Sequence, residues 1–71
     1  MATTNLRAIG RRIREIRGFD RTQVQFAKVF GITQAQLSKY ERGKNAPTLE
    51  LLLKLKHLSG KSIDWIVTGD V

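Results

Sequence analysis

The sequence predicts a single compact all-α domain, a bundle of five short helices spanning residues 1–71. Apolar residues recur at spacings of three and four, which is the period of an α-helix. Glycines divide the chain into segments of helical length, and strand-like alternation is hard to find. With 71 residues, 41% of them hydrophobic, the chain has room for one modest core.

The first helix is predicted from Asn5, an expected N-cap, to Arg17, with Gly18 ending it. Its apolar face consists of Leu6, Ile9, Ile13 and Ile16. Its arginines lie mostly on the other side, where we expect most of them to be solvated and one or two to touch phosphate: Arg7, Arg11, Arg14 and Arg17. Gly10 in the interior costs about 1 kcal/mol relative to Ala, so we expect a close helix crossing there.

A second helix is predicted to begin after Thr22 and to end at Gly31. Its inward residues are Phe26, Ala27 and Phe30.

Thr33 is the expected cap of a third helix, which ends at Gly43. Leu37 and Tyr40 continue the apolar face, and we interpret Tyr40 as core rather than as a platform for nucleic-acid bases.

Pro47 and Thr48 open a fourth predicted helix, which Gly60 closes. Its expected inward residues are Leu49, Leu52, Leu53 and Leu55. Because this helix has more leucines than one face can bury, we expect Leu51 or Leu58 to be free to contact a partner.

The fifth predicted helix is short and runs from Ser62 to about Thr68. Ile63 and Ile66 are its core candidates. Trp65 has two open interpretations, a core position or a dimer contact.

The charge balance favours a polyanionic partner. Thirteen Lys and Arg residues against six Asp and Glu give a net charge of +7. Membranes and RNA are also polyanions, so charge alone leaves the partner open, although the chain lacks the aromatic platform of single-strand readers. The apolar runs are too short to cross a bilayer and no signal peptide is recognised, so we expect a cytoplasmic protein with no membrane partner.

An enzyme is poorly supported, and no cofactor or metal is expected. There is no cysteine, and the single histidine, His57, cannot make a zinc site alone. No nucleophile–base set, paired-carboxylate pocket or phosphate-cradling glycine loop is visible.

The most informative spacing lies between residues 23 and 42. Ala27 follows Gln23 by four residues, Gly31 follows four later, and Leu37 six beyond that. Two short helices that cross at a steep angle need a small residue at their closest approach and a positive φ in the turn between them. Ala27 and Gly31 meet these two requirements.

At this point the sequence resembles the phage repressor and Cro-like (XRE) helix-turn-helix family. The resemblance covers nearly the whole chain, and its most specific part is the string from Tyr40 to Lys44. The matching segments are Ile9–Arg14, Thr22–Gln23, Phe26–Ala27, Phe30–Gln34, Leu37–Lys44, Pro47–Glu50 and Ile63–Gly69.

The resemblance implies a lambda repressor-like DNA-binding domain whose third helix lies in the major groove. Carried over by position, the residues facing the base edges are Gln34, Ala35, Gln36, Ser38 and Lys39. Glutamine can bond adenine N6 and N7 together, lysine can reach guanine O6 or N7, and an alanine methyl can touch a thymine methyl.

The family also implies contacts to phosphates that flank the groove. The residues carried over are Gln23, at the start of the second helix, and Thr33, Arg42, Lys44 and Asn45. Glu41 in such proteins pairs with an arginine of the first helix, and Arg17 is the expected partner.

The chain departs from the family pattern just before Thr22. Asp20 and Arg21 stand where the family has Gly-Leu, in a loop about one residue short. Phe19 is expected to replace the missing leucine as an anchor.

We therefore predict a sequence-specific transcriptional regulator, most simply a repressor that binds a palindromic operator as a homodimer. An antitoxin or a restriction-modification controller would use the same fold. A protein-interaction module that does not bind DNA is a third hypothesis. The sequence fits either a whole protein or the N-terminal piece of a longer one with a further C-terminal domain or protein partner.

Overall fold

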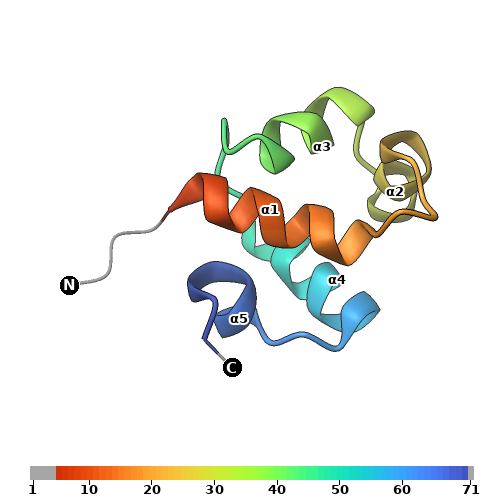
Figure 1. Ribbon diagram of the computed structural model, residues 1–71. Helices are drawn as coiled ribbons and strands as arrows, with labels where there is room; N and C mark the ends of the chain where they lie inside the picture. The colour runs from red at the N-terminus through yellow and green to blue at the C-terminus, as the bar shows by residue number, and fades with distance from the viewer. Residues whose placement is uncertain (1–4, 71) are drawn as a thin grey trace.

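The computed structural model describes residues 5–70, which contain five helices and no strand. The helices are α1 (Leu6–Arg17), α2 (Gln23–Phe30), α3 (Gln34–Glu41), α4 (Leu49–Ser59) and α5 (Ile63–Thr68). The predicted five-helix all-α fold is thus confirmed. The predicted domain also includes residues 1–4 and 71, which lie outside the described residues. Figure 1 shows α1 crossing in front of α4, with α3 above it and α5 below.

Each helix begins at a side-chain cap, three of which are the predicted ones. The capping residues are Asn5, Thr22, Thr33, Thr48 and Ser62. Their side-chain oxygens accept hydrogen bonds from backbone N–H groups of the first turn at 2.9–3.1 Å. At α2 and α3 the cap is reciprocal, because the Gln25 and Gln36 side chains accept from the backbone N–H of Thr22 and Thr33.

The buried core joins residues from all five helices. Its members are Ile9, Ile13, Phe26, Ala27, Phe30, Leu37, Leu51, Leu55 and Ile66. The Phe26 and Phe30 rings meet edge to face with centroids 4.7 Å apart, a favoured aromatic geometry. Tyr40 and Trp65 are half-buried and pack against this core, as does Ile16.

Gly10 lies at a close crossing of α1 over α3, as predicted. A Cβ at Gly10 would collide with the backbone carbonyl oxygens of Tyr40 and Glu41, with the Tyr40 oxygen only 2.6 Å away. The two backbones can therefore approach only because residue 10 has no side chain.

The predicted inward face of α4 is partly wrong. Leu55 is fully buried as expected, but Leu49 and Leu53 are 67% and 42% exposed. Of the two leucines predicted as alternatives for a partner contact, Leu51 is buried and Leu58 is 42% exposed. The reason is helical phase, since Leu51 and Leu55 are four residues apart and share the face that α4 turns to the core.

Phe19 does not anchor the loop between α1 and α2, and that expectation is wrong. Its side chain is fully exposed. Arg21 takes the anchoring role, because its guanidinium lies over the Phe26 ring, 4.9 Å from the centroid. The same group donates to the carbonyl oxygens of Arg17 and Ile16 at 3.2 and 3.1 Å.

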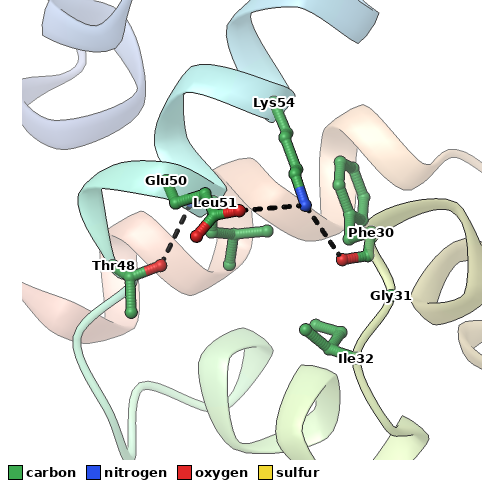
Figure 2. A pocket seen from close by; sticks show the side chains of 7 residues that line it. All are labelled: Phe30, Gly31, Ile32, Thr48, Glu50, Leu51 and Lys54. Carbon is green, nitrogen blue, oxygen red and sulfur yellow. Dashed lines mark hydrogen bonds and ion pairs between the residues drawn. The ribbon is translucent and has the colours of Figure 1, made fainter.

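The first half of α4 lies next to the turn between α2 and α3. Figure 2 shows a small hollow where the end of α2, this turn and the start of α4 meet. The Lys54 Nζ donates to the Phe30 carbonyl oxygen and lies near the Glu50 carboxylate, each at 3.4 Å (Figure 2). Lys54 thereby gives a partner to a carbonyl that the end of α2 leaves free.

Candidate nucleic-acid interface

The turn between α2 and α3 has the geometry predicted from its spacing. Gly31 adopts the left-handed conformation, with φ 68° and ψ 28°. The Ile32 N–H then donates to the Ala27 carbonyl at 3.1 Å, and this bond closes the turn that leads into α3. Leu37 is fully buried and fixes α3 to the core, leaving the opposite side of α3 in solvent.

Four of the five residues predicted to face bases share one side of α3. Together with Gln23 and Arg42 they line an open hollow, which is bordered by Gln34, Ala35, Ser38 and Lys39. Ser38 is half-buried and the other three are exposed. The hollow thus presents amide, hydroxyl and ammonium groups together with one methyl group.

Gln36, the fifth predicted base contact, does not line this hollow. Its side-chain oxygen accepts from the Thr33 N–H at 3.0 Å, so the amide lies back over the N-terminus of α3. Its backbone N–H in turn donates to the Thr33 hydroxyl at 3.1 Å. Gln36 therefore stabilises the first turn of α3, and only its amide N–H groups remain available to a ligand.

Glu41 joins three helices beneath the hollow. Its carboxylate, on a side chain only 4% exposed, accepts from Arg17 Nε at 2.9 Å and Arg17 Nη2 at 3.0 Å. This bidentate pair confirms the expected partner of Glu41. The carboxylate also accepts from Gln23 Nε2 at 3.0 Å, a contact that sequence reasoning missed.

The remaining predicted phosphate contacts are exposed and lie at the ends of α3. Thr33 caps its start, and Arg42 follows its end and borders the hollow. Lys44 and Asn45 lie in the next turn, which the hydrogen bond from the Lys44 N–H to the Lys39 carbonyl closes at 2.8 Å. Donors thus flank the exposed face of α3 at both ends.

Comparison with known proteins agrees with this geometry. A family model described as helix-turn-helix matches residues 11–66. The chain belongs to the helix-turn-helix family. The match runs from the middle of α1 into α5, so it includes the α2–α3 pair and the helices that support it.

Two curated helix-turn-helix relatives align with about two thirds of the chain. The SPbeta prophage-derived uncharacterized HTH-type transcriptional regulator YonR of Bacillus subtilis is 40% identical over 48 residues, which is 68% of this chain and 44% of YonR. An uncharacterized HTH-type transcriptional regulator of Haemophilus influenzae is 30% identical over 47 residues, which is 66% of this chain and 20% of that protein. The aligned part of the chain therefore spans less than half the length of either relative.

Solved helix-turn-helix structures match nearly the entire fold. The P22 c2 repressor protein, crystallised with synthetic operator 9T, superposes with a TM-score of 0.77 at 32% identity, covering 87% of this chain and 96% of the repressor. The restriction-modification controller protein C.AhdI of Aeromonas hydrophila gives a TM-score of 0.72 at 26% identity, covering 86% and 94%. The clp gene regulator ClgR of Corynebacterium glutamicum gives 0.74 at 26% identity, covering 90% and 69%.

Residues 5–70 contain neither a membrane-spanning helix nor a metal-binding cluster. None of the described helices has the length and apolar character that a bilayer span requires. The same residues contain no group of three or more His, Cys, Asp or Glu side chains placed to hold a metal ion.

Proposed function

We propose that the chain is a transcriptional regulator, most simply a repressor, that binds double-stranded DNA sequence-specifically through α3. The observation that carries the proposal is the polar hollow formed by Gln23, Arg42 and one side of α3. Its side chains have the length and hydrogen-bonding groups to reach base edges in a major groove, which is wide enough to admit an α-helix.

Within the hollow each side chain has a distinct role. Gln34 offers the bidentate pairing with adenine, and Lys39 reaches guanine acceptors. The Ala35 methyl fits a thymine methyl, and the Ser38 hydroxyl both donates and accepts. Gln36 contributes only an amide N–H at the edge, because its oxygen is held by the cap of α3.

Affinity is supplied by donors around the rim of the hollow. Arg42, Lys44 and Asn45 approach one flank, and the first turn of α2 with Gln23 approaches the other. Thr33 retains a hydroxyl proton, because its oxygen accepts rather than donates in the cap. Neutralised phosphates release counterions, so affinity should fall steeply as salt rises.

The proposed DNA-bound form is a homodimer on a palindromic operator. Two copies place their α3 helices in successive major grooves, about 34 Å apart along the duplex. The P22 c2 repressor supports the DNA-binding part of this proposal, because its structure superposes on this chain and was determined with a synthetic operator. We place this activity in the cytoplasm, in association with the nucleoid when the protein is bound to DNA.

Selection of bound oligonucleotides from a random pool tests the proposal. We expect an enriched site with two inverted half-sites whose centres are one helical turn apart. Enrichment of one half-site alone would contradict the dimer, and recovery of no consensus would contradict sequence-specific binding. The protein-interaction hypothesis predicts that last result.

A restriction-modification controller is a second candidate function. C.AhdI supports it, because that controller superposes over 86% of this chain. An antitoxin would use the same DNA-binding surface. The selected sites distinguish these roles, because a controller's site should precede a neighbouring restriction or modification gene and an antitoxin's site should precede its own toxin gene.

A further inference from the structure

A cluster of arginines on α1 takes no part in the proposed DNA contacts. Arg7, Arg11 and Arg14 are exposed and follow one another at intervals of four and three residues, so they form a stripe along the helix. Within residues 5–70 none of the three forms an ion pair. The other two arginines of α1 have partners. Arg17 pairs with Glu41, and Arg12 donates to the Ile66 and Val67 carbonyl oxygens.

This stripe occupies the side of α1 that no other helix covers. Gly10 and Arg17 face α3, Arg12 faces α5, and the buried Ile9 and Ile13 face the core. In Figure 1 the same arrangement is visible, with neighbours above, below and behind α1. The arginine stripe therefore points to solvent beside the α3 surface, and its first member, Arg7, lies against Gly43 in the turn after α3.

Phe19 lies at the end of the stripe, in the loop from α1 to α2. Its side chain is fully exposed. The loop around it is held in place, since Arg17 Nη1 donates to the Arg21 carbonyl at 3.1 Å and Arg21 donates back to the end of α1. Phe19 thus lies in solvent at a defined position. A partner that covers its ring would remove apolar surface from water and so lower the free energy.

Arg11, Arg14 and Phe19 meet at one open hollow of about 530 Å³, larger than the hollow of about 350 Å³ along α3. Glu15 also lines it and offsets part of the positive charge. We propose that this arginine–Phe19 surface (Arg7, Arg11, Arg14 and Phe19) binds an acidic polypeptide segment that carries a large apolar side chain. The carboxylates pair with the stripe while the apolar side chain covers Phe19.

The chemistry favours a polypeptide over a DNA backbone. Phosphates would use the arginines but would leave the Phe19 ring in water, whereas a peptide satisfies both at once. The hollow on α3 differs in this respect, because it is lined by polar groups and a single methyl. The inference goes beyond the proposed function, since the arginine–Phe19 surface shares no residue with the proposed DNA contacts.

Fluorescence anisotropy with two labelled acidic peptides tests the inference on the full chain. The peptides have equal length and charge, one with a central Trp and the other with Ser in its place. We expect the Trp peptide to bind about tenfold more tightly, and Phe19→Ser to abolish that difference. Replacing both Arg11 and Arg14 with Gln should lower the affinity for both peptides, by about threefold for each arginine removed.

Matched variants control for charge and exposure. Lys28→Gln with Lys56→Gln removes the same charge elsewhere, and Val24→Ser removes an apolar side chain that is 45% exposed on α2. Both should leave peptide affinity and the preference for Trp unchanged. A circular-dichroism melt of each variant should match the native chain, because the replaced side chains are exposed.

Four outcomes would overturn the inference. They are equal binding of the two peptides to the native chain, binding of neither, and an equal loss when Lys28 and Lys56 are replaced. The fourth is a loss of affinity for random duplex DNA in the Arg11→Gln, Arg14→Gln variant as large as that caused by Arg42→Gln, since the stripe would then belong to the DNA surface. If no DNA binds at all, the proposed function fails while the peptide result still decides this inference.

Discussion

The carboxylate of Glu41, near the end of α3, accepts a hydrogen bond from the Gln23 side chain at the start of α2, at 3.0 Å. The same carboxylate holds Arg17 of α1 through two further bonds. One buried acid thus fixes the relative positions of the three helices that surround the proposed DNA surface. Its loss should therefore disturb stability and DNA affinity together.

Replacing Glu41 with Gln should destabilise the fold by about 3 kcal/mol, because the 15%-exposed Arg17 side chain loses its counter-charge. Urea unfolding measures this change. The double variant Glu41→Leu, Arg17→Met should recover most of the stability, since no unpaired charge remains. It should still bind all DNA sequences more weakly than the native chain, because Gln23 has lost its positioning partner. Native affinity in the double variant would show that Gln23 needs no such support.

Gln34 and Gln36 should respond differently to truncation. Gln34→Ala should weaken binding to the selected operator by about 1–3 kcal/mol and barely change binding to random DNA. Gln36→Ala should instead lower stability by about 0.5–1 kcal/mol, because its oxygen completes the cap of α3. Titration of operator and random duplexes, with thermal melts of the free proteins, separates the two effects. Equal losses on both duplexes would remove Gln34 from the reading surface.

Lys44→Ala should lower affinity on all sequences alike. Lys44 is exposed in the turn after α3, and we propose that it contacts a phosphate rather than a base edge. Losing one phosphate contact should reduce the slope of log affinity against log salt by about 1. Lys56→Ala, an exposed lysine on α4, is the matched control. An unchanged salt slope for Lys44→Ala would refute its phosphate role.

Gly10→Ala should destabilise the chain although alanine favours helices. The added Cβ would push against the carbonyl oxygens of Tyr40 and Glu41, which belong to backbone and cannot move aside cheaply. The strain should exceed the gain in helix propensity of about 1 kcal/mol and leave a net loss of about 1–3 kcal/mol. Urea unfolding measures it, with Arg11→Ala as an exposed control on α1. A stabilised Gly10→Ala chain would contradict the close crossing.

Local signals predicted the helix boundaries well. Thr22, Thr33 and Ser62 cap their helices because a short hydroxyl side chain reaches the backbone N–H groups three residues on, whatever the rest of the fold does. The roles of Gly31 and Gly10 could also be predicted, since Gly31 supplies a positive φ in a turn and Gly10 permits a close approach of two helices. Such features depend on a few adjacent residues or one crossing.

The errors concern features that depend on tertiary packing. α4 has leucines on several faces, so its pattern does not determine whether Leu49 or Leu51 turns inward. A charged residue takes the place of an expected apolar anchor, because the Arg21 guanidinium packs on Phe26 while Phe19 stays in water. The bond from Gln23 to Glu41 joins residues eighteen positions apart, and no local spacing indicates it.

Nuclear magnetic resonance of the labelled chain, titrated with its selected duplex, shows which helix the DNA contacts. We expect the largest amide shift changes at Gln34, Ala35, Ser38 and Lys39, with smaller ones at Gln23 and Arg42. Changes concentrated on α4 and α5, with α3 unaffected, would contradict the claim that α3 binds the DNA.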